Sequence, residues 1–260
     1  MQDKVIVITG ASSGIGEKFA EVVAARGART VLAGRRAAEL TAVATRLGPA
    51  ALAVVTDVTR RADVDQLRDR ALERFGQIDV WVSNAGRGIT RSVTQLTDDD
   101  FDDMMATNVK SMLYGIQSVI PHFRDRRRGH LITVSSMLGR ISMAPFRSAY
   151  SAAKAAANSL MTSLRLELRA DYPDIHVSTV LPGVVATGFG ANALHGGPDS
   201  RTLPNAQPVD EVARAIADLI DHPRAELYTR PEMATLASRY FTADDVATVE
   251  AGPPFAMPRR

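Results

Sequence analysis

An apolar run followed by closely spaced glycines near the start of the chain constrains its fold more than any other stretch. Residues 4–9 read KVIVIT, the pattern of a buried strand, and residues 10–16 read GASSGIG before a long alanine-rich helical pattern. Glycines let the backbone turn sharply and approach a ligand closely, and the free amides at a helix start attract a pyrophosphate. The stretch therefore predicts an α/β fold with a dinucleotide held by Gly10, Ser12, Ser13, Gly14, Ile15 and Gly16.

A second pattern, Tyr150-x-x-x-Lys154, is typical of acid–base chemistry. Side chains four residues apart lie on one face of a helix, so the two groups would touch. A free phenol has a pKa of ~10, and a neighbouring ammonium favours the phenolate, which predicts a lowered pKa for Tyr150. Ser136 follows an apolar run at residues 131–135, so a strand would deliver its hydroxyl to the same cleft. Taken alone, the Tyr and Lys have a plainer interpretation, since many helices carry such a pair by chance.

The two patterns together, T-G-x-x-x-G-x-G and Y-x-x-x-K, resemble those of the short-chain dehydrogenase/reductase family, and the resemblance covers nearly the whole chain. It implies reversible hydride transfer between NADP(H) and a small-molecule carbonyl or alcohol. It also implies that Tyr150 protonates the carbonyl oxygen, Lys154 lowers the pKa of Tyr150 and binds the ribose, and Ser136 polarises the carbonyl. The chain departs from the family in that Tyr150 lies fourteen positions after Ser136, rather than the usual thirteen.

Other site residues are implied by the same resemblance. Asn108 falls where the family keeps a fourth catalytic residue, whose side chain would hold a water against Lys154; by itself it is as well explained as an exposed helical residue. Asp57 and Val58 would contact the adenine ring, although Asp57 also suits a turn that caps the next helix. The remaining cofactor contacts follow two further predicted strands and are Asn84, Ala85, Gly86, Pro182, Gly183, Val185 and Thr187.

Two arginines predict which dinucleotide is preferred. In a dinucleotide fold, the residue at the end of the second strand meets the adenosine ribose, where an acid suits a free 2′-hydroxyl and an arginine suits a 2′-phosphate. Gly34 stands in the place of the acid, and Arg35 and Arg36 follow it. The sequence therefore predicts a preference for NADP(H), with NAD(H) still possible, unless the arginines simply belong to a solvated loop.

Composition and charge exclude several classes of function. The chain has 260 residues, no cysteine and a net charge of +2, so it has no thiolate nucleophile, no cysteine-ligated zinc and no strongly basic face for nucleic acid. We expect no metal ion. Its first residues, MQDKVIVITG, lack the pattern of a signal peptide, and no apolar run is long enough to span a membrane. These features predict a cytoplasmic protein that does not bind membranes.

Strand and helix patterns alternate along the chain, which predicts a single-domain, Rossmann-like, doubly wound parallel sheet with helices on both faces. We expect one dinucleotide-binding domain over residues 1–250, with a substrate loop at 188–208 and an extended tail at 251–260. A last helix at 209–220 and a short strand at 225–229 complete the sheet. His195, in the substrate loop, is interpreted as a solvated residue.

Two expectations concern partners and function. A stripe of small residues on the predicted helix at 150–169 suits close contact with another helix, which predicts a homotetramer or homodimer; it comprises Ala152, Ala155, Ala156, Ser159 and Ser163. The alternative to an oxidoreductase is a non-catalytic NADP(H)-binding sensor or scaffold subunit, because a fold does not dictate a function.

Overall fold

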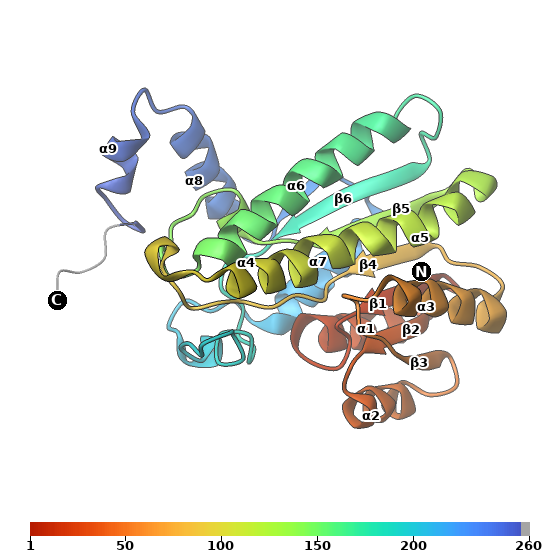
Figure 1. Ribbon diagram of the computed structural model, residues 1–260. Coiled ribbons are helices and arrows are strands. Elements are labelled where there is room, and N and C mark those ends of the chain that lie inside the picture. Colours follow the sequence, from red (N-terminus) through yellow and green to blue (C-terminus); the bar gives the residue numbers. More distant parts are fainter. Residues whose placement is uncertain (256–260) are drawn as a thin grey trace.

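The computed structural model describes residues 1–255 and contains one seven-stranded sheet (Figure 1). The order of strands is β3-β2-β1-β4-β5-β6-β7, and every neighbouring pair is parallel. Their bounds are β1 Val5–Thr9, β2 Arg29–Gly34, β3 Ala51–Val55, β4 Val80–Ser83, β5 Gly129–Val134, β6 Ile175–Leu181 and β7 Glu226–Tyr228. The predicted doubly wound parallel sheet is confirmed.

Helices cover both faces of the sheet because the central strands are apolar on both sides. In β1, Ile6 and Ile8 belong to one core cluster, and the alternate residues Val5 and Val7 belong to the other. The first cluster packs against α1 (Gly14–Ala25), α2 (Ala37–Leu47) and α7 (Val209–Asp221). The second packs against α3 (Arg61–Phe75), α5 (Ser111–Arg126) and α6 (Ser148–Leu168). Successive strand residues point to opposite faces, so continuous apolar runs such as VIVI suit a strand buried on both sides.

The direction of winding reverses at β1, and this reversal places the ligand site. The chain runs outward from β1 through β2 to β3 and then crosses back to β4, on the other side of β1. In open α/β sheets, ligands bind outside the carboxyl ends of the strands at such a reversal. The glycine turn follows β1 and residues 84–86 follow β4, so two of the predicted segments meet there.

Irregular turns connect several of these elements. The helix α4 (Asp98–Met105) begins with a capping box in which Thr97 and Asp100 bond to each other's backbone amides. A π-helical turn, η2 (Ala106–Lys110), joins α4 to α5. Three short 3₁₀ turns are η1 (Val93–Gln95), η3 (Met137–Gly139) and η4 (Ser200–Thr202).

The C-terminal region differs from the prediction. Two helices that the sequence analysis did not expect, α8 (Pro231–Phe241) and α9 (Val246–Glu250), follow β7. Apolar residues of α8 cover the buried side chains of Met137 and Ile141. The second helix, α9, packs against α8, and the Tyr240 hydroxyl donates to Glu250 Oε1 at 2.7 Å. The extended tail is wrong for residues 251–255, since they form a turn in which Phe255 stacks on Tyr240 with 5.7 Å between ring centroids. The rest of that prediction, residues 256–260, lies outside the described residues.

Within residues 1–255, none of the helices combines the length and the apolar character needed to cross a bilayer.

Candidate active site

The glycine turn between β1 and α1 leaves no room for a side chain at Gly10 or Gly16. Gly10 and Gly14 have φ values of 68° and 59°, which other residues rarely adopt. A Cβ on Gly16 would lie 2.4 Å from the carbonyl oxygen of Gly10, so any side chain there would displace the turn. Ser13 occupies the N-cap of α1 without a side-chain capping bond, so its hydroxyl does not cover the first amides of the helix. This cradle fits the pyrophosphate of a dinucleotide.

Asn84, at the end of β4, braces the glycine turn against the neighbouring strand. Its side-chain amide donates to the carbonyl oxygens of Thr9 and Gly10, at 2.9 and 3.3 Å. The backbone amides of Asn84 and Ala85 both donate to the Thr9 hydroxyl, at 3.0 and 3.1 Å. The Asn84 side chain is therefore committed to holding β1 and β4 together.

The ends of β2 and β3 bring charged groups beside the glycine turn. Arg36 Nη2 donates to Ser13 Oγ at 2.7 Å and to Ser12 Oγ at 3.0 Å, so its guanidinium lies against the turn. Burial alone would raise the pKa of the Asp57 carboxyl, but hydrogen bonds from Thr59 and the charges of Arg35 and Arg60 lower it. Asp57 Oδ1 accepts from the amide and hydroxyl of Thr59, so Asp57 is a turn residue. It does not cap α3, whose N-cap is Arg60 without a side-chain capping bond. Val58 beside it is half-buried.

Tyr150, Lys154 and Ser136 meet beyond the carboxyl end of β5. Tyr150 and Lys154 lie on consecutive turns of α6, with Lys154 Nζ 5.6 Å from the centroid of the phenol ring. All three residues are buried, and the Ser136 hydroxyl lies close enough to the phenol to influence its pKa. The loop between η3 and α6 accommodates the fourteen-residue spacing.

The expected lowering of the Tyr150 pKa is wrong for this structure. Burial raises the pKa of the phenol to about 12 and outweighs the opposite effects of the Ser136 hydroxyl and the Arg147 charge. Burial also lowers the pKa of Lys154 to about 8. Lys154 Nζ donates to the Val134 carbonyl oxygen at 2.9 Å rather than to the phenol oxygen, so desolvation controls both groups.

Asn108 lies in the π-helical turn, and the turn explains its hydrogen bonds. The Ser111 amide donates to the Ala106 carbonyl oxygen, five residues back, as in a π-helix. The Ser111 hydroxyl donates to the Thr107 carbonyl oxygen at 2.6 Å. The Asn108 amide donates to the carbonyl oxygens of Met104 and Arg87, at 3.1 and 3.0 Å.

The other end of the Asn108 side chain accepts a bond from the Arg87 amide at 3.2 Å. This carboxamide is buried and engaged with protein groups at both ends, so its observed role is to hold the loop after β4. A Cβ on Gly86 would lie 2.9 Å from Asn108 Oδ1 and 3.4 Å from Lys154 Nζ. Gly86 therefore keeps open the space that these two polar groups share.

The segment after β6 lies over the same site. The Pro182 carbonyl accepts from the Met137 amide at 2.8 Å, which ties this segment to the Ser136 loop. Val185 pairs with Gln207 in an isolated bridge, and Gly183 is half-buried. A Cβ on Gly14 would lie 3.4 Å from Thr187 Cγ2, so Thr187 stands directly across from the glycine turn.

The predicted substrate loop at 188–208 lies beside Tyr150. The Leu194 amide donates to the Gly88 carbonyl at 2.8 Å, which joins this loop to the one after β4. The ring of Phe189 lies 5.5 Å from the Tyr150 ring, centroid to centroid. The His195 side chain is one-third exposed, but its Nε2 is also 2.6 Å from Asp100 Oδ1, so the solvated interpretation is incomplete.

Sequence reasoning missed two residues beside Tyr150, namely Phe189 and Arg147. Phe189 stood out only as an apolar residue in a polar loop. Arg147 precedes Tyr150 by three residues, a spacing that places both on one helical face and offered a signal. Contact between Phe189 and Tyr150 depends on how the loop folds back, which local pattern does not reveal.

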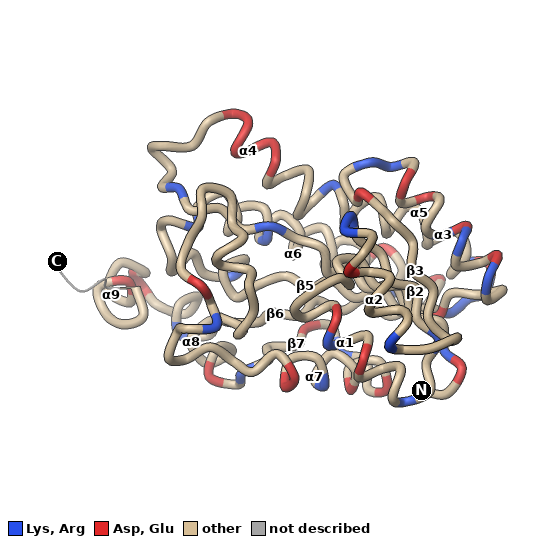
Figure 2. Tube along the Cα trace, turned by 90° about the horizontal axis from the view of Figure 1, so that it is seen from below, with Lys and Arg blue, Asp and Glu red and all other residues tan. Residues whose placement is uncertain are grey.

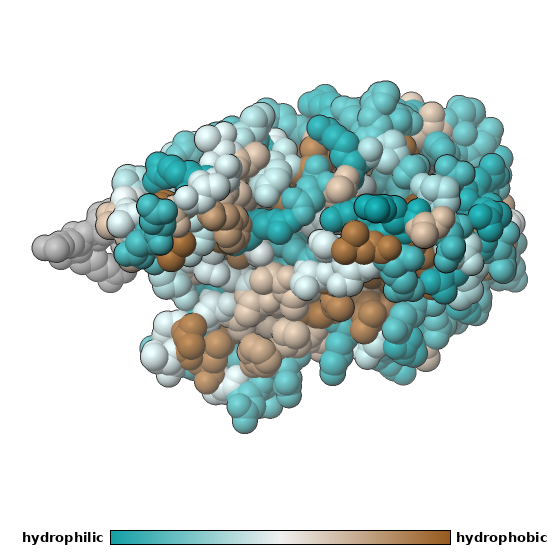
Figure 3. Space-filling model, turned by 90° about the horizontal axis from the view of Figure 1, so that it is seen from above, coloured by the Kyte–Doolittle hydropathy of each residue, from teal (hydrophilic) through white to brown (hydrophobic). Residues whose placement is uncertain are grey.

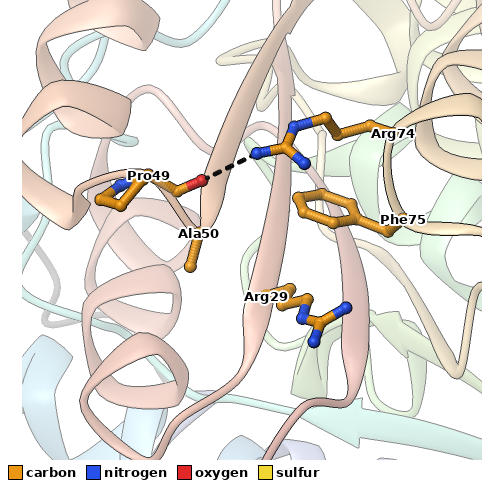
Figure 4. Close-up of a pocket in the computed structure, with 5 residues that line it drawn as sticks. All are labelled: Arg29, Pro49, Ala50, Arg74 and Phe75. Carbon is orange, nitrogen blue, oxygen red and sulfur yellow. Dashed lines mark hydrogen bonds between the residues drawn. The ribbon is translucent and has the colours of Figure 1, made fainter.

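Neither the charge distribution nor a pocket at the other end of the strands points to another site. Figure 2 shows acidic and basic residues interspersed over the helices, with an acidic stretch on α4. A pocket of about 310 Å³, lined by Arg29, Pro49, Ala50, Arg74 and Phe75, lies at the amino ends of β2 and β3 (Figure 4). Arg74 donates across it to the Pro49 carbonyl at 3.2 Å. This pocket therefore lies at the opposite end of the strands from Tyr150.

Comparisons with known proteins agree with this geometry. The sequence profile of the family described as short chain dehydrogenase matches residues 4–196. An uncharacterised oxidoreductase of Staphylococcus aureus is 36% identical over 192 residues, which are 74% of this chain and 82% of the relative. An uncharacterised oxidoreductase of Listeria innocua is 37% identical over 190 residues, 72% of this chain and 76% of the relative.

Solved structures give the same result. A short chain dehydrogenase/reductase from Burkholderia phymatum, in complex with NAD, has a TM-score of 0.86 at 25% identity and covers 100% of this chain and 98% of its own. A 3-ketoacyl-(acyl-carrier-protein) reductase from Brucella melitensis, in complex with NADH, has a TM-score of 0.79 at 30% identity, over 87% of this chain and 96% of its own. With the profile match, the sheet order and the position of the glycine turn in agreement, the chain belongs to the short chain dehydrogenase family of oxidoreductases.

Proposed function

We propose that this protein is an NADP(H)-dependent oxidoreductase that interconverts a carbonyl and a primary or secondary alcohol. The observation that carries the proposal is the meeting of Tyr150, Lys154 and Ser136 beyond the carboxyl ends of the strands, where the glycine turn also lies. A dinucleotide on that turn would supply the hydride. The arrangement supports hydride transfer at a carbon whose oxygen faces Tyr150.

The side chains act on the oxygen of the substrate. With a pKa of about 12 the Tyr150 phenol is protonated at neutral pH, so it donates a proton to a carbonyl oxygen during reduction. The Ser136 hydroxyl donates a hydrogen bond to the same oxygen and polarises the carbonyl. The charged Lys154 ammonium stabilises the phenolate that proton transfer leaves, and Asn108 holds the loop that carries Gly86 beside it.

The preference for NADP(H) rests on Arg35 and Arg36. Arg36 lies against Ser12 and Ser13 of the glycine turn, and Arg35 contributes positive charge near Asp57. Gly34 carries no carboxylate that would repel a 2′-phosphate. The related structures were solved with different nicotinamide nucleotides, since an alcohol dehydrogenase from Thermococcus sibiricus was complexed with 5-hydroxy-NADP and the two proteins above with NAD and NADH. The preference is therefore a property to measure in this chain.

An absorbance assay of cofactor oxidation tests the proposal against the alternative of a non-catalytic NADP(H)-binding sensor. We expect NADPH consumption with at least one member of a panel of aldehydes, ketones, ketosteroids and β-ketoacyl thioesters, and slower consumption of NADH. Tight NADPH binding without turnover of any member would favour the sensor.

We also propose a homotetramer or homodimer in which α6 takes part. Ala152, Ala155, Ser159 and Ser163 of the small-residue stripe are exposed, and Leu160 and Leu166 on the same helix are 38% and 61% exposed. Figure 3 views the molecule from above and shows apolar residues grouped along one part of that face. Small residues allow close helix contact. A monomer by light scattering at micromolar concentration would contradict this proposal.

A further inference from the structure

Arg147 is a buried cation without a counterion in the part of the chain that the structure describes. Arg147 is 8% exposed and occupies the N-cap position of α6. Two arginines of the neighbouring loop pair with carboxylates of α4, Arg87 with Asp103 and Arg91 with Asp100, each at 3.5 Å. Arg147 has no such ion pair among residues 1–255.

Hydrogen bonds use little of the donor capacity of Arg147. Its Nη1 donates to the Ile89 carbonyl oxygen at 3.1 Å, which is its one side-chain hydrogen bond among residues 1–255. A guanidinium offers five N–H donors in a planar fork. Burying a charge without a partner is costly, and a neutral donor would satisfy the Ile89 carbonyl equally well. The guanidinium also lies over the Phe146 ring, 5.5 Å from its centroid, but no carboxylate among residues 1–255 neutralises its charge.

The guanidinium faces the space beside the catalytic tyrosine. A Cβ on Gly88 would lie 3.0 Å from Arg147 Nη1 and 3.0 Å from Phe189 Cε1, so both side chains border the room that this glycine leaves. Phe189 also contacts the Tyr150 ring, and the Arg147 charge acts on the phenol. A proton donor, a cation and an aromatic ring thus surround one small region under the substrate loop.

We propose that Arg147 binds a carboxylate of the substrate, so that this protein acts on oxo acids and hydroxy acids whose carboxylate lies within a few bonds of the reacting carbon. A carboxylate matches the planar fork of an arginine with two parallel hydrogen bonds. The inference rests on the proposed function and narrows its substrate class. In reduction, the carbonyl gains a hydride from the reduced cofactor at carbon and a proton from Tyr150 at oxygen, and the carboxylate is unchanged.

A purely structural role for Arg147 is the competing explanation. Its bond to Ile89, together with the bond from the Arg91 amide to the Phe146 carbonyl at 2.8 Å, joins the loops on either side of the site. The variant Arg147→Gln separates the two roles, because glutamine keeps a neutral donor and removes the charge. Arg87→Gln is the matched control, since its side chain is on the neighbouring loop and is already paired.

The first measurement compares benzoylformate with its neutral methyl ester, and 4-oxopentanoate with its methyl ester, as substrates with NADPH. We expect kcat/KM for the better acid to exceed that for its ester by about ten- to a hundredfold, the range expected for one charge-assisted fork. In Arg147→Gln this ratio should fall to about one through a higher KM for the acid, and in Arg87→Gln it should persist. Equal use of acids and esters by the wild type, or an unchanged ratio in Arg147→Gln, would overturn the proposal.

The second measurement needs no turnover. Calorimetric titration of each oxo acid into wild type saturated with NADP⁺ reports binding directly, and we expect at least one of them to bind and Arg147→Gln to bind it at least tenfold more weakly. If no carbonyl of any kind is reduced, the proposed function fails, while this titration still decides whether Arg147 holds a carboxylate. Absence of binding of both acids to the wild type would overturn the inference. If Arg147→Gln does not fold, two other measurements decide whether Arg147 binds the carboxylate. One is the comparison of acid with ester in the wild type, and the other is the same comparison in Arg147→Lys, which keeps the charge and loses the planar fork.

Discussion

The proposed cofactor end and the proposed substrate end of this site are built in different ways. At the cofactor end, the glycine turn and the start of α1 present backbone, and Gly10 and Gly14 supply the conformations that the turn requires. At the substrate end, side chains converge from three loops and one helix, including Ser136, Tyr150 and Phe189. The first end depends on a local stretch with one brace from Asn84, whereas the second depends on long-range packing.

This difference affects the chemistry as well as the shape. A turn made of backbone keeps its hydrogen-bonding groups whatever packs around it. The pKa values of Tyr150 and Lys154 are instead set by burial, under the loop that carries Phe189. Changes at the cofactor end should therefore alter which nucleotide binds, and changes at the substrate end should alter proton transfer.

The largest effect is expected from a substitution of Tyr150, which should change turnover at the substrate end and leave nucleotide binding at the cofactor end unchanged. Tyr150→Phe removes the transferable proton and its oxygen, so we expect kcat to fall by ~10² to 10⁴ while NADPH affinity stays nearly unchanged. Steady-state rates and a fluorescence titration of NADPH measure the two quantities. Tyr172→Phe, at the amino end of β6, is the control and should keep full activity. Retention of a tenth of the wild-type rate by Tyr150→Phe would refute its role.

A smaller effect is expected at the cofactor end. Gly34→Asp with Arg35→Val should reverse a preference for NADPH that we expect to be roughly ten- to a thousandfold, because it exchanges a cation for a carboxylate at the 2′-position. The backbone at Gly34 accepts a Cβ, which would meet Ser12 Oγ at an ordinary 3.4 Å. Titrations of both nucleotides at two ionic strengths check this. Equal affinities in the wild type, or no shift toward NADH in the double variant, would show that these arginines only decorate a loop.

Burying the charged Lys154 side chain at the substrate end lowers the stability of the folded protein by an amount that can be measured. Its folded pKa of about 8 lies below the ordinary value of 10.5, so the folded state carries an unfavourable charge below pH 8. In the window between these values the unfolded chain binds more protons, so stability rises with pH. Lys154→Met should therefore stabilise the protein at pH 7 by roughly 1 to 3 kcal/mol, and the difference should shrink toward pH 10.

Urea unfolding at pH 7 and pH 10 measures this gain, with the exposed Lys110→Met as control. Because Lys154 also belongs to the proposed catalytic set, the same variant should lose turnover. A loss of stability in Lys154→Met at pH 7 would contradict the argument from desolvation.

The smallest effect concerns the contact that holds the substrate loop. His195 donates to Asp100, and this hydrogen bond is the main reason why the pKa of Asp100 is lowered. The stability that this lowered pKa of Asp100 contributes is fully present above the ordinary pKa of the carboxyl, 3.8. It is lost as the pH falls through the lower pKa of the folded state. His195→Ala should raise the substrate KM severalfold at pH 7, leave NADPH affinity unchanged, and reduce the loss of stability on acidification below pH 4.

The exposed residue His222 gives the matched control His222→Ala. Steady-state kinetics at pH 7 and unfolding curves between pH 3 and pH 6 distinguish the two variants. If His195→Ala and His222→Ala behave alike, the contact with Asp100 does not hold the loop.

Much of the fold and of the cofactor end was determined by the sequence alone. The order of strands and helices followed from apolar periodicity, and the glycine turn followed from residues 10–16, because both depend on neighbours close in the chain. Tyr150 and Lys154 were found for the same reason, since a four-residue spacing is a local property of a helix.

The tertiary structure decided the rest. The raised pKa of Tyr150 comes from burial under a loop almost forty residues away, and the helix α8 after β7 covers Met137 and Ile141. The π-helical turn at Asn108 is completed by bonds to Arg87, which belongs to another loop. Desolvation and long-range contact depend on which segments meet in space, and a local pattern carries no information about that meeting.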